Sequence, residues 1–252
     1  MNPINTQSET VRSDTVRLAK RVAEQFGCSR ADATHYIEGG WISVDGVVSE
    51  LPGARVDTMQ TVALLDGAVL TPVEPVTILF HKPAGLAHAD IVATPNALLS
   101  TDTRYADDKS GVNFLQRHLR DLTATSPLDR DASGLVVLTQ DYRIARKLVD
   151  EANRIEHELV VEVDGSMKEG GIDLLQGQAS WNGKPLNALK VSWQSEQRLR
   201  FALKGLQMGM IKHLCQQVDL NVIAIKRIRI GRIAMASLPV GRWRYLSEFE
   251  RF

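Results

Sequence analysis

The pattern between residues 16 and 50 limits most strongly what this chain can fold into. Two stretches, residues 16–27 and 29–40, carry apolar side chains at helical spacing and follow each other with almost no spacer. Gly27 stands where the first helix should end, and Ser29 is a suitable N-cap for the second. The dipeptide Asp45-Gly46 then lies between alternating apolar residues, which is a strong hairpin signal. The sequence therefore predicts two short helices followed by a β-hairpin.

A change of pattern after this unit indicates a second domain. Residues 1–14 are mainly polar and are predicted to form a flexible tail, and residues 15–66 form the small first domain. The segment 67–76 contains Pro72 and Pro75 with little periodicity, which favours a linker. Residues 77–252 mix helical and strand patterns with neither strict alternation nor an internal repeat, so we expect an α+β fold.

The net charge hides a gradient along the 252 residues. The chain has 30 Lys and Arg against 30 Asp and Glu, which gives a formal net charge of zero. Residues 196–252 nevertheless hold eleven basic and four acidic residues. A basic segment of this kind favours a phosphate-rich ligand, and an ordinary solvated charged face is the alternative interpretation.

The sequence lacks the signals that are typical of several classes of protein. Cys28 and Cys215 are far apart and the six histidines show no helical ligand spacing, so we expect neither a disulfide framework nor a metal site. The chain has no apolar run long enough to span a membrane and no secretory signal, so we expect a cytoplasmic protein without membrane association. Glycine-rich phosphate loops and serine nucleophile elbows are also absent from the sequence.

The densest candidate for chemistry is the segment 126–141, SPLDRDASGLVVLTQD. Its polar turn holds Asp129 and Asp131 and runs directly into an apolar strand pattern. A carboxylate at the edge of a core strand is held rigidly and partly desolvated, as a nucleophile or general base must be. The residues alone leave two other interpretations open: an ordinary structural turn, and a hydrolase that uses both carboxylates.

The segment IKRIRIGR, residues 225–232, predicts a strand with two arginines on one face. Period-two geometry places Arg227 and Arg229 together on a surface and sends Ile228 and Ile230 into the core. Contact with phosphate groups is the function that this arrangement favours. A charged edge strand that discourages aggregation is the alternative.

The first domain resembles the S-four RNA-binding domain. The matching residues are RLAKRVAEQFGCSRADATHYIEGGWISVDGVV, from position 17, and with the PGARVD turn they cover about fifty positions. The resemblance implies that basic side chains of the helices contact structured RNA. The candidates are Arg17, Lys20, Arg21 and Arg30, and the alternative is that they form the wet face of two amphipathic helices.

The second domain resembles the pseudouridine synthases. Residues 128–139, LDRDASGLVVLT, match the family's central motif, which usually reads G-R-L-D-x-x-[TS]-x-G-L-[LV]-[LV]-[LF]-T. The segment ILFHKPAGL is similar to the family's strand ending in N-K-P-x-G, and residues 215–246 are similar to its C-terminal run. The order of these motifs fits the branch that modifies ribosomal RNA and carries an S-four domain. The resemblance extends from Arg17 to Leu246.

This resemblance implies a mixed, mainly antiparallel β-sheet flanked by helices and the isomerisation of a uridine within RNA. The enzyme would flip the base out of its stack, act as a monomer on ribosomal RNA, and need no cofactor. Asp129 matches the catalytic aspartate of the family, and Lys212 falls on a basic position expected to lie near it. Leu159 is expected in the base pocket, and the further expected RNA contacts are Lys82, Arg130, Arg227 and Arg229.

Four positions depart from the family pattern. Pro127 stands where an arginine precedes the catalytic aspartate, and Met210 stands where glutamine is usual. His157 and Leu159 replace the lysine and tyrosine of the K-x-Y strand, so no aromatic ring is available there to stack on the base. These differences keep a second hypothesis open, in which a catalytically degenerate homologue serves as an RNA-binding or ribosome-assembly factor.

Overall fold

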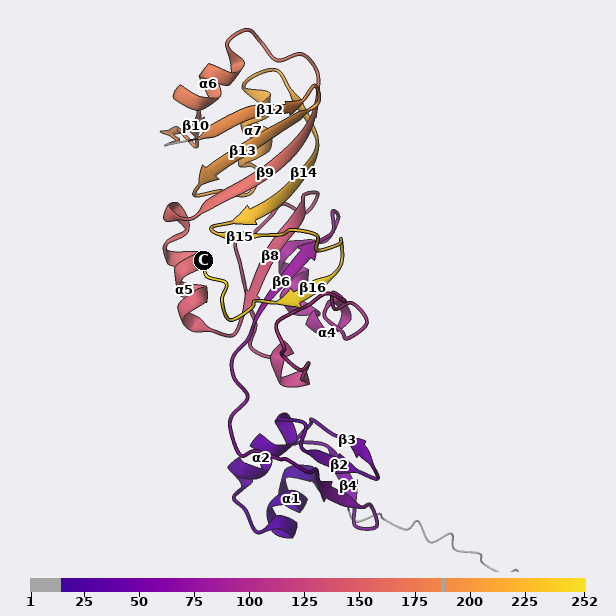
Figure 1. Ribbon diagram of the computed structural model, residues 1–252. Coiled ribbons are helices and arrows are strands. Elements are labelled where there is room, and N and C mark those ends of the chain that lie inside the picture. The colour runs from indigo at the N-terminus through magenta and orange to yellow at the C-terminus, as the bar shows by residue number, and fades with distance from the viewer. Residues whose placement is uncertain (1–14, 187–188) are drawn as a thin grey trace, which may run out of the picture. The chain divides into compact units, whose positions relative to one another are not determined.

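A computed structural model of the protein describes residues 15–186 and 189–252. The chain divides into two compact units, shown in Figure 1. One unit comprises the residues up to 74 together with 115–117, and the other comprises residues 75–114 and 118–252. The division after residue 74 falls inside the segment predicted as a linker, and the predicted tail, residues 1–14, lies outside the described residues.

The first unit contains the predicted helices and hairpin. Strand β1 (Thr15–Arg17) runs into α1 (Leu18–Phe26), which ends at Gly27 in the left-handed conformation, and α2 (Arg30–Glu38) follows. Ser29 and Asp32 exchange hydrogen bonds with each other's backbone N–H, which forms a capping box at the start of α2. These contacts confirm the predicted end of the first helix and the predicted cap of the second.

The strands of the first unit form two small antiparallel sheets. Strands β2 (Ile42–Val44), β3 (Val47–Val48) and β5 (Val62–Leu64) form one, and β4 (Arg55–Asp57) pairs with β1 in the other. Asp45 and Gly46 both have positive φ, which the tight turn between β2 and β3 requires. The core of this unit consists of Leu18, Val22, Ala33, Ile37, Ile42, Val56 and Val62.

The second unit is built on a mixed sheet in the order β12-β13-β9-β14-β8-β6-β16. In addition, β7 pairs with β8, and β15 pairs with β14. Its strands are β6 (Thr77–Lys82), β7 (Thr123–Thr125), β8 (Ser133–Thr139), β9 (Glu156–Asp164), β12 (Lys190–Ser195), β13 (Arg198–Lys204), β14 (Asn221–Ile230), β15 (Ile233–Ala234) and β16 (Trp243–Tyr245). A separate hairpin is formed by β10 (Ser180–Trp181) and β11 (Lys184–Pro185). The pairing of β14 with β8 is parallel and the other pairings of this sheet are antiparallel, as the resemblance implied.

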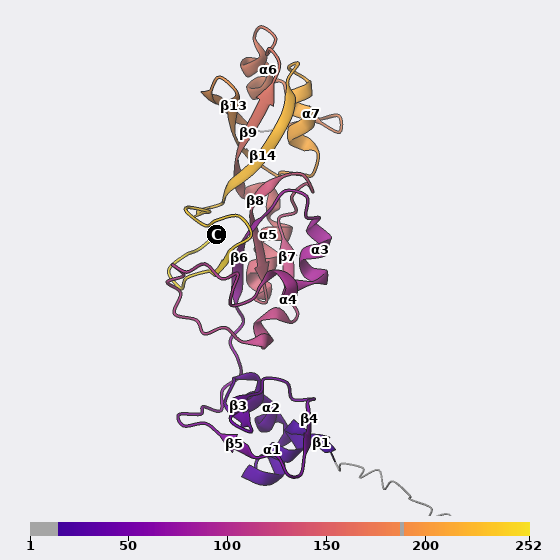
Figure 2. The same ribbon diagram turned by 90° about the vertical axis from the view of Figure 1, so that its right-hand side faces the viewer.

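Helices cover both faces of this sheet (Figure 2). The helices are α3 (His88–Ala93), α4 (Pro95–Leu98), α5 (Tyr142–Asp150), α6 (Gly171–Gly177) and α7 (Met210–Gln216), with short 3-10 turns η1 (Gln116–Leu119) and η2 (Ala152–Arg154). On one face, side chains of α3, α6 and α7 join a large core with β6, β8, β9 and β13. On the other face, Leu148 of α5 packs with Leu79, Leu135 and Val137. The expected α+β class is therefore confirmed.

Within the described residues, no helix combines the length and apolarity needed to cross a membrane.

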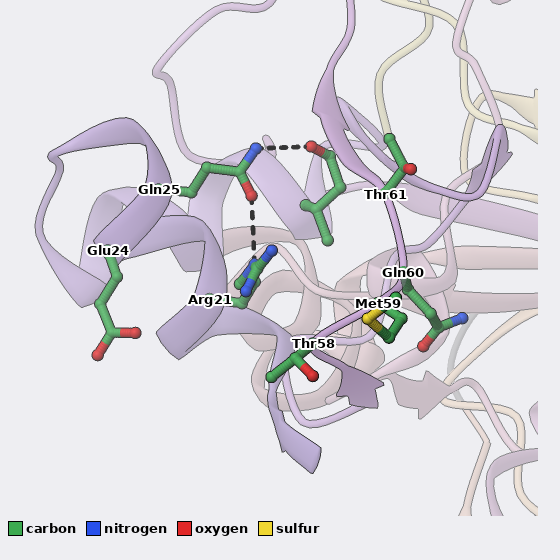
Figure 3. Close-up of a pocket in the computed structure, with 8 residues that line it drawn as sticks. Arg21, Glu24, Gln25, Thr58, Met59, Gln60 and Thr61 are labelled. Atoms are coloured by element: carbon green, nitrogen blue, oxygen red, sulfur yellow. Dashed lines mark hydrogen bonds between the residues drawn. The ribbon is translucent and has the colours of Figure 1, made fainter. Parts of the chain in front are cut away.

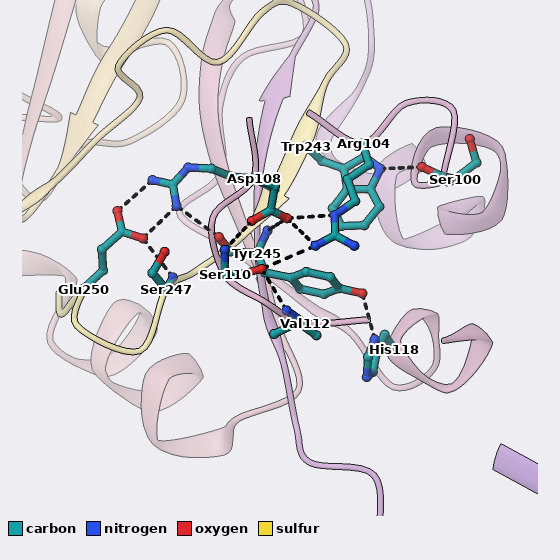
Figure 4. Close-up of polar contacts among 11 residues, drawn as sticks. Ser100, Arg104, Asp108, Ser110, Val112, His118, Trp243, Tyr245, Ser247 and Glu250 are labelled. Carbon is teal, nitrogen blue, oxygen red and sulfur yellow. Dashed lines mark hydrogen bonds and ion pairs between the residues drawn. The ribbon is translucent and has the colours of Figure 1, made fainter. Parts of the chain in front are cut away.

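A polar cluster fixes the segment after α4 against β16 (Figure 4). Arg104 pairs with Asp108 at 2.8 Å, and its guanidinium carbon lies 4.9 Å from the ring centre of Tyr245 and 5.8 Å from that of Trp243. The Asp108 carboxylate also accepts the backbone N–H groups of Ser110 and Tyr245 at 3.0 and 3.2 Å. This cluster joins a long irregular segment to the C-terminal strand of the sheet.

The backbones of β8 and β14 approach each other closely where β8 begins. Gly134 has a φ of 119°, and a Cβ built on it would lie 2.3 Å from the carbonyl oxygen of Arg227 on β14. No other residue type fits at this position, because a side chain would push the two strands apart. The turn that carries Asp129 leads directly into this contact.

Candidate active site

Arg227 holds the backbone immediately before Asp129. Its side chain is fully buried and donates to the carbonyl oxygens of Leu135 at 2.8 Å, Ser126 at 2.7 Å and Pro127 at 3.3 Å. Burial lowers the pKa of Arg227 to about 9, which still leaves the guanidinium charged at neutral pH. The residue thus connects β14, β8 and the turn that carries the candidate catalytic carboxylate.

The prediction that Arg227 and Arg229 share an exposed face is wrong. A β-bulge interrupts β14 between them, so that Arg227 lies opposite Leu159 and Arg229 lies opposite Glu158. Neighbouring residues of β9 point to opposite faces of the sheet, and the two arginines therefore do so as well. Arg229 forms ion pairs with Glu156 at 2.6 Å and Glu158 at 2.7 Å, and hydrogen bonds from these two carboxylates raise its pKa.

Lys82 also lies inside the protein, which contradicts its predicted role as an RNA contact. Its ammonium donates to the carbonyl oxygens of Ala132 at 2.7 Å and of Pro83 and Arg130 at 3.0 Å. Burial lowers the pKa of Lys82 to about 8, so the charged form still predominates at pH 7. The side chain joins the end of β6 to the turn around Asp129. The predicted contact Arg130 is exposed on this same turn and donates to the carbonyl oxygen of Gly85.

The Asp129 carboxylate is half-buried and is held by a backbone group from a distant loop. The N–H of Gly209 donates to both carboxylate oxygens, at 2.9 and 3.1 Å. Gly209 has a φ of 79° and directly precedes α7. A bidentate contact of this kind orients the carboxylate and leaves its outer lone pairs free to face a substrate.

Lys212 lies at the turn that carries Asp129, where its ion-pair partner is the neighbouring carboxylate of Asp131. Its ammonium pairs with Asp131 instead of Asp129, and this hydrogen bond is the largest cause of the lowered pKa of Asp131. Asp129 and Asp131 therefore have separate partners, a backbone N–H and a lysine. This separation gives no support to a hydrolase in which the two carboxylates act as one acid–base pair.

Leu159 and Asp129 line the same small pocket. The wall consists of Pro127, Leu128, Asp129, Leu159, Leu206, Gln207, Met208, Ile211 and Ile225. The cavity measures about 10 Å³, which is room for about one water molecule and far less than a pyrimidine needs. A base can enter only after part of this wall has moved. Met208 is an exposed apolar side chain of the wall, with 55% of its surface accessible.

His157 fills the place of the family's lysine without carrying a charge. It is buried on β9, and burial together with the charges of Arg227 and Arg229 lowers its pKa to about 3. The imidazole is therefore neutral at physiological pH. His157 therefore does not supply the positive charge that a lysine would supply at this position.

In the first unit, three of the four predicted RNA contacts lie together. Arg17, Lys20 and Arg30 line a concavity of about 560 Å³ with Arg55, which the sequence analysis did not identify. Arg17 and Arg55 are direct cross-strand partners on β1 and β4, although like charges in such positions repel each other. The position of Arg55 on a strand opposite β1 is visible only in the fold.

Arg21 lies in a different concavity of the same unit (Figure 3). Its guanidinium donates to the side chain of Gln25 at 3.3 Å, and Gln25 in turn donates to the carbonyl oxygen of Val62. The other residues that line this surface include Met59 and Gln60. Arg21 therefore does not join the cluster of Arg17.

Comparison with known proteins supports the resemblance that the motifs predicted, although no family model matches the chain. The dual-specificity RNA pseudouridine synthase RluF of Escherichia coli is 28% identical over 239 residues, covering 94% of this chain and 77% of that protein. An uncharacterized RNA pseudouridine synthase of Aquifex aeolicus is 26% identical over 238 residues, covering 93% and 94% of the two chains. The ribosomal small subunit pseudouridine synthase A of Escherichia coli is 26% identical over 241 residues, covering 93% and 98%.

The fold agrees with these matches. The crystal structure of a pseudouridylate synthase has a TM-score of 0.57 with this chain at 18% identity, covering 92% of this chain and 96% of the other. At this identity the likeness establishes the fold. Together, the sequence and fold comparisons confirm the resemblance to RNA pseudouridine synthases along nearly the whole chain.

Proposed function

We propose that this chain, similar to RNA pseudouridine synthases along nearly its whole length, isomerises a uridine in RNA with Asp129 as its catalytic carboxylate. One observation carries the assignment of the residue. The aspartate at the matched motif position lines a pocket with Leu159 and is held there by the Gly209 N–H. A carboxylate is ionised at neutral pH and suits attack on a nucleoside that is losing its base.

In the proposed mechanism, the target uridine leaves its stack and enters the pocket at Asp129. The carboxylate bonds to the nucleoside as the glycosidic bond to nitrogen breaks, and the freed base turns. A ring carbon of the base then bonds to the sugar as the carboxylate leaves, that carbon loses its proton, and the freed ring nitrogen takes one up, so that the product is an isomer of the uridine. Gly209 orients the carboxylate, while Arg227 and Lys82 fix the backbone on either side of it. Leu159 supplies an apolar contact to the base in place of a stacked ring.

Ribosomal RNA is the proposed substrate, and the first unit is its proposed docking site. One relative acts on the small ribosomal subunit according to its name. The concavity with Arg17, Lys20, Arg30 and Arg55 concentrates positive charge, and the repulsion between Arg17 and Arg55 is relieved when a phosphate binds between them. We place the protein in the cytoplasm, acting as a monomer, on the same resemblance.

The test of catalysis is pseudouridine mapping across total RNA from strains that lack the gene. The deletion strain is restored with the wild type, with Asp129→Asn, or with Asp131→Asn as the matched control. We expect one position to be lost in the deletion and restored by the wild type and by Asp131→Asn, but not by Asp129→Asn. An asparagine keeps an oxygen for the Gly209 N–H, so the fold should survive this change.

The same experiment decides the alternative of a degenerate RNA-binding factor, which Pro127, His157 and the small pocket favour. If no position changes while the protein still sediments with ribosomal particles, the binding factor is the better assignment. Full restoration by Asp129→Asn would remove that residue from the mechanism.

RNA binding by the first unit has its own test. Arg17→Gln and Arg55→Gln should each weaken binding of ribosomal RNA and reduce the slope of log affinity against log salt by about one. Arg21→Gln is the matched control, because its side chain lies in the separate concavity. Equal losses for all three variants, measured by salt-dependent titration, would argue against a localised phosphate site.

A further inference from the structure

Trp181 contacts the loop 205–209, whose Gly209 N–H binds the Asp129 carboxylate. Trp181 itself lies 52 positions after Asp129 in the chain. It belongs to the β10–β11 hairpin, where Asn182 and Gly183 both have positive φ and form a tight turn. Its indole N–H donates to the side-chain oxygen of Gln207 at 3.0 Å, and its ring meets that of His213 edge-on at 5.3 Å. The far edge of the ring lies 3.5 Å from the point where a Cβ on Gly209 would stand.

The loop contacted by this tryptophan, residues 205–209, serves the pocket in two ways. Gly209 donates its N–H to Asp129, while Leu206, Gln207 and Met208 form part of the pocket wall. Gly205 and Gly209 bound the loop and both have positive φ, at 66° and 79°. Glycines at both ends allow the middle of the loop to change conformation at low cost.

These two functions of the loop conflict when a base arrives. The cavity is too small for a pyrimidine, so part of its wall must move for the base to enter, and Met208 is an exposed side chain of that wall. If the whole loop moved with Met208, the Gly209 N–H would leave Asp129. Trp181 approaches the residues on either side of Met208: it donates a hydrogen bond to Gln207, and its ring edge lies 3.5 Å from the point where a Cβ on Gly209 would stand.

From this arrangement we infer that Trp181 is a positioning residue, which keeps the Gly209 N–H on Asp129 while Met208 yields to the incoming base. Trp181 acts through Gln207 and Gly209 and contacts no reacting atom. The inference rests on the proposed function for its effect on turnover. Its effect on Gly209 is measurable without turnover.

The first arm of the test measures hydrogen exchange at the Gly209 amide in the full-length protein. Trp181→Ala should accelerate this exchange about tenfold or more, because the amide is no longer held on its acceptor. Trp181→Phe keeps the ring contact and loses only the indole N–H, so it should give a smaller acceleration. Trp193→Ala is the matched control, since Trp193 is a partly exposed tryptophan on β12, where it is paired with Leu199 of β13.

The second arm measures kcat and KM on ribosomal RNA. Loss of one hydrogen bond should lower kcat about three- to tenfold in Trp181→Phe, with KM nearly unchanged, and more strongly in Trp181→Ala. Gln207→Leu should match Trp181→Phe, and the double variant should lose no more than either single variant, because both remove the same bond. Trp193→Ala should keep the wild-type kcat.

The outcomes separate the inference from the proposed function. Unchanged Gly209 exchange in folded Trp181→Phe and Trp181→Ala would overturn the inference, whatever their activity. The inference would also be overturned if the loss of kcat in the double variant equalled the combined losses of the two single variants, or if the variants changed only KM. An inactive wild type would count against the proposed function alone, since the exchange arm decides the positioning role by itself.

Discussion

The guanidinium of Arg227 shows at the scale of one residue how the site is held. Replacing it with methionine, which is similar in length, leaves the carbonyl oxygens of Leu135, Ser126 and Pro127 without their donor. We expect Arg227→Met to lower the free energy of unfolding by about 3 kcal/mol. Arg229→Met is the matched control on the other face of β14, and its partly exposed ion pairs should contribute about 1 kcal/mol. Urea titration of both variants measures the difference, and equal losses would contradict the assigned role.

Single residues also show how far the sequence could predict this site. The motif match placed Asp129 and Leu159, and the structure brings both into one pocket. Gly209 and Trp181 escaped prediction because Gly209 reaches Asp129, and Trp181 reaches Gln207, only in the folded chain. Lys82 was misassigned because the resemblance places it at the end of a strand without showing its burial, and all six residues of β6 are buried.

At the scale of elements, the contact between β8 and β14 depends on one glycine. A Cβ at position 134 would stand 2.3 Å from the Arg227 carbonyl oxygen, and a residue with a side chain would have to adopt a φ of 119° there. We expect Gly134→Ala to destabilise the protein by about 3 kcal/mol or more and to reduce turnover, because the Asp129 turn leads into this strand pair. Gly177→Ala is the matched control, because that glycine lies in α6 with open space around it. Equal unfolding temperatures for the two variants would contradict this prediction.

Elements also explain why β14 was mispredicted. The alternation in residues 225–230 is regular, and a strict period of two would have put both arginines on the surface. The bulge between Arg227 and Arg229 reverses the face after one residue. Nothing in the local sequence marks this bulge. Its surroundings come from other strands: Gly134 of β8 lies close to Arg227 on one side, and Glu158 of β9 pairs with Arg229 on the other.

At the scale of the whole molecule, stability should fall on the acid side because buried carboxylates of the second unit are paired. Burial raises the pKa of Asp108, but the hydrogen bonds from Ser110, Tyr245 and Arg104 outweigh it, so the pKa lies below its ordinary value of 3.8. For Glu250, Arg244 and Ser247 likewise outweigh burial and hold the pKa below 4.5. A carboxylate with a lowered pKa in the folded state stabilises the protein fully above its unfolded pKa and loses this contribution as the pH falls through the folded value.

The variant Asp108→Asn isolates one of these contributions within the folded chain. At pH 7 it should unfold with about 2 kcal/mol less free energy than the wild type, since the ion pair to Arg104 is lost. The difference should shrink as the pH falls below 3.8, because the wild-type carboxyl then becomes protonated as well. Urea titrations from pH 7 to pH 3 measure the convergence, with Asp107→Asn, an exposed neighbour, as the control. A difference that stayed constant over this range would mean that Asp108 acts through its shape and hydrogen-bond geometry rather than its charge.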